Sequence, residues 1–142
     1  MKYIFLDIDG VLNSSGDKNL IFGIVDVSKL ELFCKLVNKT NSNVVVISSR
    51  RIYKEDRDLI LRALDDIYDK LSFISYNMNY KYRKDEINLF LSNNPCDKYV
   101  ILDDIDSNYT KDKDMINHFI HINTMKGFTD EDYIKAITIL NK

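Results

Sequence analysis

Apolar runs that are typical of buried strands alternate along this chain with segments whose apolar residues recur at helical spacing. The strand-like runs cover residues 3–6, 44–47, 71–74, 99–102 and 119–122. The helix-like segments cover residues 30–37, 60–67, 87–91 and 134–140. Such alternation is typical of βαβ units with right-handed crossovers. The pattern therefore predicts an α/β, three-layer Rossmann-like fold around a mostly parallel five-stranded sheet.

Turn and capping residues refine this outline. Residues 13–26 connect the first strand to the first helix and contain Gly16 and Gly23. The apolar residues of this connection predict a short hairpin or flap, with no room for a separate folded domain. Ser28 with Glu31 resembles a capping box at the start of the first helix, and Thr129 with Asp132 resembles one at the start of the last helix.

The first strand ends in acidic residues. Residues 3–6 are all apolar, as in a strand buried on both faces, and Asp7, Asp9 and Gly10 follow. Residues two apart in an extended segment point the same way, so the two carboxylates are expected to share one side. Crowded carboxylates repel each other unless a cation compensates, and Gly10 permits an unusual φ or a close backbone approach. The stretch predicts a divalent cation site at the end of a central strand.

Polar residues also follow other predicted strands. Ser48 and Arg50 follow the second strand, and Asp103 with Asp104 follows the fourth. Lys84 opens the helix that precedes the fourth strand. Ligands of open parallel sheets bind outside the carboxyl ends of the strands, so we expect these side chains to gather around one site.

Composition limits the class of protein. The 142 residues are 45% hydrophobic and fit one domain, residues 1–142. The formal net charge of -2 offers no general attraction to nucleic acid or to a membrane. Cys34 and Cys96 lack metal-site spacing, and no signal-like or membrane-spanning run is present. We therefore expect a cytoplasmic protein with reduced thiols and no membrane partner.

In order along the chain, these residues resemble the four motifs of the haloacid dehalogenase (HAD) superfamily. The segment Phe-Leu-Asp-Ile-Asp-Gly-Val-Leu (residues 5–12) resembles motif one, and residues 44–50 resemble motif two. Lys84 resembles the motif three lysine, and residues 101–104 resemble the acidic motif four. With residues 127–132 before the last helix, the chain is most similar to the small capless HAD domains of nucleic-acid repair proteins, including the phosphatase half of polynucleotide kinase-phosphatases.

The resemblance implies a phosphatase that acts through an aspartyl-phosphate intermediate. Asp7 would be the nucleophile, and Asp9 would protonate the leaving group and then activate water. The implied cofactor is Mg²⁺, held by Asp7, the backbone carbonyl of Asp9 and either Asp103 or Asp104.

The same resemblance implies contacts with the phosphate. Ser48 would hydrogen-bond a phosphoryl oxygen, and Lys84 would neutralise the same oxygens and steady Asp7. Many relatives carry an aromatic residue between the motif two serines and the arginine, whereas here Arg50 follows directly, so either Arg50 or Arg51 could meet the substrate. The implied substrate-binding residues are Gly10, Ser49, Arg50 and Arg51.

Other classes fit the sequence less well. A response-regulator receiver has its acidic pair after the first strand, whereas here the pair comes late. The phosphate-loop pattern of NTPases is absent. A HAD-like binding module without activity is the non-enzyme alternative. His118 and His121 alternate with apolar residues and are interpreted as structural.

The substrate is suggested by the lengths of the connections. Neither inter-motif gap can hold a cap domain, so we expect an open site suited to a large substrate. Residues 50–54 and 80–84 combine cations with tyrosines, which suit phosphates and bases. With the resemblance, this favours a phosphorylated DNA or RNA end, above all a 3′-phosphate, over a nucleotide or another small phosphomonoester. A separate kinase or ligase is the implied protein partner.

Overall fold

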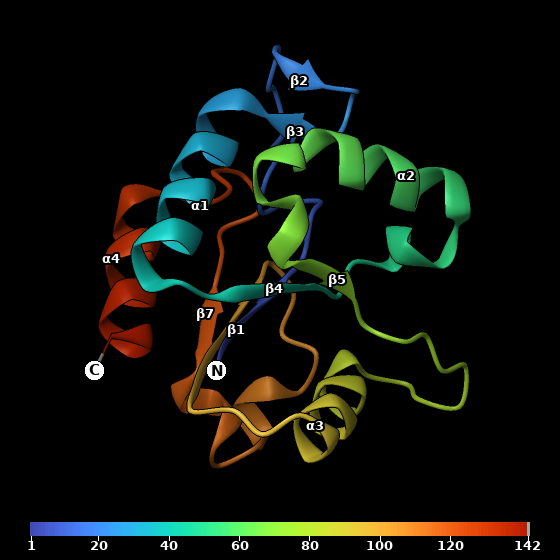
Figure 1. Ribbon diagram of the computed structural model, residues 1–142, viewed down its shortest axis with the longest axis vertical. Helices are drawn as coiled ribbons and strands as arrows, with labels where there is room; N and C mark the ends of the chain where they lie inside the picture. The colour runs from blue at the N-terminus through green and yellow to red at the C-terminus, as the bar shows by residue number, and fades with distance from the viewer. Residues whose placement is uncertain (142) are drawn as a thin grey trace.

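The sheet of the computed structural model, which describes residues 1–141, is parallel throughout and has the strand order β5-β4-β1-β6-β7 (Figure 1). Its strands are β1 (Lys2–Leu6), β4 (Asn43–Val46), β5 (Leu71–Phe73), β6 (Lys98–Asp103) and β7 (Phe119–His121). The first strand of the chain is therefore central, as predicted. The separate antiparallel hairpin of β2 (Leu20–Ile21) and β3 (Val25–Asp26) is the predicted flap.

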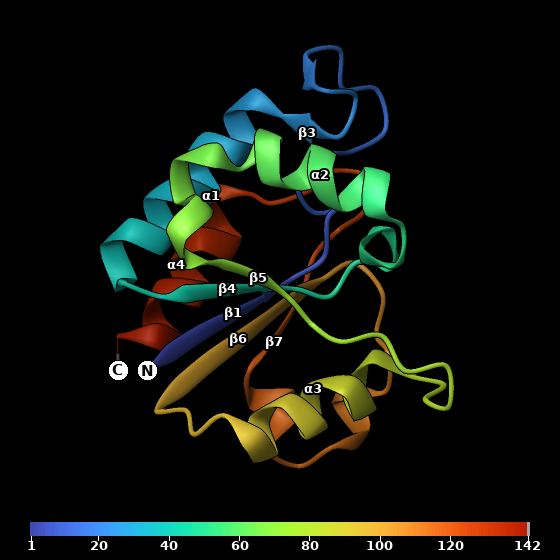
Figure 2. The same cartoon turned by 45° about the vertical axis from the view of Figure 1, so that its right-hand side comes forward.

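Helices cover both faces of the sheet and complete the predicted three-layer fold (Figure 2). The α-helices are α1 (Val27–Thr40), α2 (Lys54–Ala63), α3 (Arg83–Asn93) and α4 (Asp130–Leu140). The 3₁₀ turns are η1 (Ser49–Ile52), η2 (Asp65–Lys70), η3 (Tyr109–Lys111) and η4 (Met115–Asn117). Within residues 1–141, no helix has the length and apolar character needed to cross a membrane.

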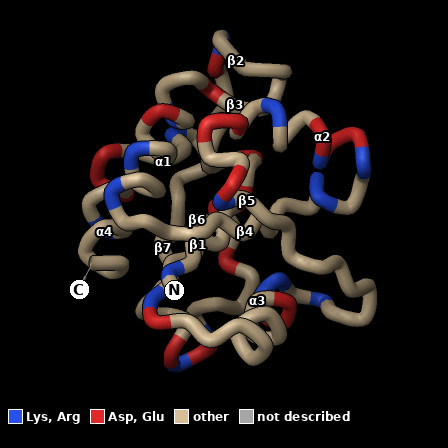
Figure 3. Tube along the Cα trace, viewed as in Figure 1, with Lys and Arg blue, Asp and Glu red and all other residues tan. Residues whose placement is uncertain are grey.

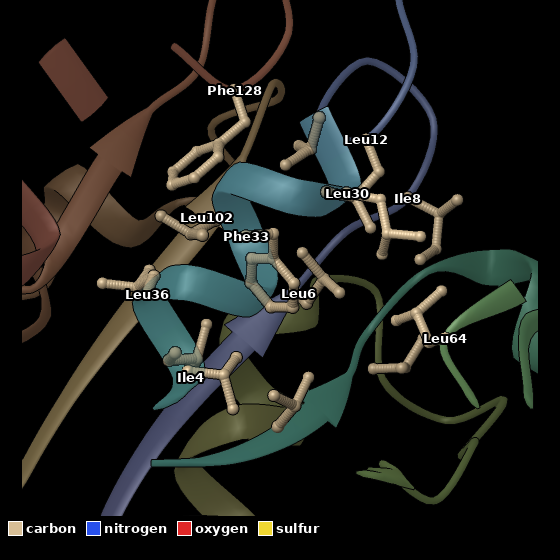
Figure 4. Packing of buried hydrophobic residues seen from close by; sticks show 14 of the residues in the cluster. Ile4, Leu6, Ile8, Leu12, Leu30, Phe33, Leu36, Leu64, Leu102 and Phe128 are labelled. Atoms are coloured by element: carbon tan, nitrogen blue, oxygen red, sulfur yellow. The ribbon is translucent and has the colours of Figure 1, made fainter. Parts of the chain in front are cut away.

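The two faces of the sheet bury separate clusters because successive strand residues point in opposite directions. Ile4 and Leu6 pack with α1, α2 and α4, as Figure 4 shows for the α1 side. Tyr3 and Phe5 of the same strand pack with α3 and the turns η3 and η4. Burial on both faces explains why β1 is apolar at every position after Lys2.

Helix starts confirm one capping prediction and correct another. Thr129 and Asp132 form the expected capping box of α4. Ser28 and Glu31 do not cap α1, because the helix begins earlier, at Val27, and the carboxylate of Asp26 accepts the hydrogen bond from the Lys29 amide. Asp26 ends β3 in an extended conformation, which places its side chain over the first free amides of the helix.

The second predicted helix is also divided. Its α-helical part ends at Ala63, and Ile67 belongs to the 3₁₀ turn η2, where its own backbone angles are not helical. Ile60, Ala63 and Ile67 nevertheless all join the same core, so the predicted apolar face is retained across the break.

Candidate active site

Three carboxylates meet at the carboxyl ends of the central strands. The pairing of Leu6 with Leu102 in adjacent parallel strands brings Asp7, which follows β1, next to Asp103, the last residue of β6. One oxygen from each of Asp7, Asp103 and Asp104 lies within 4.8 Å of the others. Three of the four predicted metal residues therefore gather at one place, while the Asp9 carboxylate pairs with Arg50 outside this group.

Gly10 lets the third carboxylate approach. Its φ is +82°, and a Cβ at this position would lie 2.6 Å from Cγ of Asp104 and closer still to Oδ2. The close backbone approach expected of Gly10 is thus present, and it is directed at a metal-ligand candidate. Oδ1 of Asp104 is buried and has no hydrogen-bond partner within residues 1–141, which leaves an acceptor free for a cation.

Arg83 is the cation that lies against these carboxylates. Its Nη1 is 2.9 Å from Oδ2 of Asp103 and 3.4 Å from Oδ2 of Asp7. The resemblance implies Lys84 at this position, whereas the structure places its neighbour Arg83 there. If all three carboxylates are ionised, one guanidinium leaves two negative charges, which matches one divalent cation.

The packing of α3 explains why Arg83 faces inward. Phe90 packs edge-on against Tyr3 and Phe5 under the sheet, with ring centroids 5.1 and 5.5 Å apart. Residues seven apart lie on the same side of a helix, so Arg83 shares the inner face with Phe90. Within residues 1–141, the ion pairs of Asp7 and Asp103 are made by Arg83 and not by Lys84. The pKa of Asp112 is lowered mainly by the Met115 amide, and the charge of Lys84 adds a smaller effect.

The pKa of Asp7 is strongly perturbed by its surroundings. Burial first, and then the negative charge of Asp103, raises the pKa of Asp7 to about 9, although Arg83 acts in the opposite direction. Such a shift is typical of a carboxylate cluster arranged for a cation or for catalysis.

Tyr109 forms a buried hydrogen bond with Asp103 that the sequence does not predict. The buried Tyr109 hydroxyl donates to Oδ2 of Asp103 over 2.8 Å, and the Ile105 amide donates to Oδ1 over 3.1 Å. Nothing in the local sequence indicates this contact, apart from the general need of a buried tyrosine hydroxyl for a partner.

Asp9, in the loop that follows β1, is exposed to solvent and lies outside the cluster of three carboxylates. Nε and Nη2 of Arg50 donate to its two oxygens over 2.7 and 3.0 Å, and Nδ2 of Asn13 donates over 3.1 Å. Burial alone would raise the pKa of Asp9, but these hydrogen bonds outweigh it and hold the pKa below its usual range. Nδ2 of Asn13 also donates to the Ile24 carbonyl over 2.7 Å, which ties Asp9 to the flap.

Of the two candidate arginines, only Arg50 reaches the site. The Arg51 guanidinium is buried, donates to three backbone carbonyls and pairs with Oε2 of Glu86 over 2.6 Å. Arg51 therefore supports the loop that follows β4, and of the two arginines it is Arg50 whose guanidinium is directed to an acid of the site. Ser48 is buried, and its Oγ accepts from the Arg50 amide over 3.2 Å, so its own proton can be donated elsewhere. Ser49 is exposed beside it.

Comparison with known proteins identifies the family. The model of the HAD domain in Swiss Army Knife RNA repair proteins matches residues 3–133, which include all of the carboxylates above. The chain belongs to this family. No match was found among curated proteins or among solved structures. Membership of the HAD domain family suggests a phosphatase-type role, and the family generally uses Mg²⁺.

The residues present in this HAD domain fit such a cation. The donor set consists of carboxylate oxygens, the ligands that Mg²⁺ prefers. The unpaired Oδ1 of Asp104 and the excess negative charge both favour a divalent ion. Asp7, Asp103 and Asp104 are thus the residues that could hold it, while the Asp9 carboxylate is directed to Arg50.

Proposed function

We propose that this HAD domain is a Mg²⁺-dependent phosphomonoester hydrolase that forms an aspartyl-phosphate on Asp7 and acts on phosphorylated RNA ends, with a 3′-phosphate as the preferred group. The single observation that carries the proposal is the cluster of Asp7, Asp103 and Asp104 beside Arg83. The description of the family as a domain of RNA repair proteins supports the choice of substrate.

Asp7 attacks phosphorus, and its carboxylate becomes part of the acyl phosphate while the alcohol oxygen leaves. The bound Mg²⁺ would supply positive charge between the nucleophile and the phosphate oxygens. Arg83 adds a fixed positive charge at the same place, which is worth most where negative charge develops in the transition state. Ser48 donates its hydroxyl proton to a phosphoryl oxygen, and Arg50 offers a second guanidinium.

Asp9 acts first as acid and then as base. Its contact with Arg50 favours the ionised form, which suits activation of water for hydrolysis of the intermediate. To protonate the leaving oxygen in the first step, Asp9 must give up that contact. A substrate phosphate that draws Arg50 toward itself leaves Asp9 free to take up a proton.

The open surroundings of the site support a large substrate. Only the flap and α1 lie between β1 and β4, and only η1, α2, η2 and β5 lie between β4 and α3, within residues 1–141. None of these is a folded cap. A nucleotidase or another small-molecule phosphomonoesterase is the alternative, and a binding module without activity is the second alternative.

A phosphate-release assay tests the proposal. The substrates are a 3′-phosphorylated oligoribonucleotide, its 5′-phosphorylated and deoxyribose counterparts, a mononucleotide and p-nitrophenyl phosphate, each with Mg²⁺ or with EDTA. We expect Mg²⁺-dependent release that is fastest from the 3′-phosphorylated RNA, and none from Asp7→Asn. Preference for the mononucleotide would favour the first alternative, and no release from any substrate would favour the second.

A further inference from the structure

A groove of about 300 Å³ begins at the active site and runs along the segment between β5 and α3. Arg83 lines this groove, as does Ser49 of the loop after β4. The rest of the lining includes three tyrosines of the segment before α3 and comprises Arg51, Ile52, Tyr76, Tyr80, Lys81, Tyr82, Glu86, Ile105 and Ser107. The groove therefore continues from the residue that contacts Asp7 and Asp103 to a surface rich in tyrosine.

Tyr76 has the arrangement of a stacking platform. The guanidinium carbon of the buried Arg51 lies 5.9 Å from the centre of the Tyr76 ring, within the range of a cation–π contact. The residue is nevertheless 55% exposed, so much of the ring is open to the groove. Because Arg51 is itself held by Glu86 and three carbonyls, the ring rests on a rigid support.

The remaining lining suits a nucleoside better than a second phosphate. The segment before α3 carries no charge until its basic residues begin close to the helix, as Figure 3 shows in tan and blue. Exposed apolar surface comes from Ile52 and Ile105. Lys81 and Arg83 therefore place positive charge next to the start of α3, where Arg83 contacts the site, whereas Tyr76 lies in the uncharged part of the segment. A nucleotide likewise has its charge on the phosphate and its stacking surface on the base.

We propose that this groove seats the terminal nucleoside of a single-stranded RNA end, with the base stacked on Tyr76, while the terminal phosphate lies at Asp7. The inference rests on the proposed function and adds the part of the substrate that is recognised. A groove of this volume is at the lower limit for small-ligand sites, which is enough for one nucleoside.

The experiment measures binding in an Asp7→Asn background with Mg²⁺, which separates recognition from turnover. The probes are a fluorescein-labelled oligoribonucleotide with a 3′-phosphate and the same strand whose last residue lacks its base. We expect tighter binding of the complete strand by roughly tenfold, the value of one base on one aromatic ring. Tyr76→Ala should abolish the difference between the probes, and Tyr76→Phe should retain it.

Tyr68→Ala is the matched control, because Tyr68 is 59% exposed but lies on η2, outside the groove. It should leave the difference between the probes unchanged. Equal binding of both probes, or an unchanged difference in Tyr76→Ala, would overturn the groove proposal. A phosphopeptide that binds as tightly as the RNA would also overturn it. Base-dependent binding without phosphate release from any substrate by the wild-type chain would refute the phosphatase function and support the groove alone.

Discussion

The backbone of Gly10 lies so close to Asp104 that the carboxylate occupies the space a Cβ would need. The glycine that ends the first acidic motif therefore shapes the position of the last one, 94 residues later in the chain (104 − 10). Sequence proximity links Gly10 to Asp7 and Asp9, but its closest steric partner comes from the loop after β6.

Gly10→Ala should displace Asp104 and weaken the cation site. Gly16→Ala is the matched control, since Gly16 also has a positive φ, +87°, but nothing lies within 4 Å of the added Cβ. Both changes should lower the free energy of unfolding by about 1–2 kcal/mol, because each places a Cβ on a residue with left-handed backbone angles. Only Gly10→Ala should also reduce Mg²⁺ affinity, measured by calorimetric titration. Equal Mg²⁺ affinity in the two variants would show that Asp104 is not a ligand.

Arg83→Met should reduce kcat/KM for p-nitrophenyl phosphate by about 10²–10³, the usual effect of removing one donor that stabilises transition-state charge. Lys84→Met removes the same charge one residue away and should change kcat/KM little, because Arg83 and not Lys84 pairs with Asp7 and Asp103 within residues 1–141. Steady-state kinetics at saturating Mg²⁺ makes the comparison. A larger loss in Lys84→Met than in Arg83→Met would restore the assignment suggested by the family motif.

Metal affinity should rise with pH. Because the pKa of Asp7 is raised to about 9, the metal-free native state holds a proton that the unfolded chain has lost above about pH 4. The free energy of unfolding without metal therefore falls as pH rises from about 4 to 9. A cation must displace this proton, so Mg²⁺ affinity should increase by up to about tenfold per pH unit in that window. Thermal unfolding with and without Mg²⁺ at pH 6, 7 and 8 measures both trends, and Asp7→Asn should flatten them.

The buried pair of Arg51 and Glu86 should be sensitive to loss of one partner. Glu86→Ala leaves a buried guanidinium without its counter-charge and should cost about 3–5 kcal/mol. Asp58→Ala breaks the exposed pair of Lys54 and Asp58 and should cost at most about 1 kcal/mol. Urea unfolding of both variants tests the contrast. A loss in Glu86→Ala no larger than in Asp58→Ala would show that Arg51 finds other compensation.

The sequence alone determined the succession of strands and helices along the chain. It also determined which acids follow the strands. Apolar periodicity is a local property, so the five strands of the sheet and the acids Asp7, Asp103 and Asp104 that follow two of them can be assigned from the sequence. Thr129 with Asp132 was predictable for the same reason, because a capping box depends on residues three apart.

Tertiary structure decided which side chains serve the site. Arg83 and Lys84 differ by one position, and the apolar residues of α3 suit either register until Phe90 meets Tyr3 and Phe5. Arg50 and Arg51 are likewise adjacent, and Glu86 from another helix draws only Arg51 into the interior. Neighbouring residues on a helix or tight turn point in different directions, and only the packing of distant elements determines which direction leads to the site.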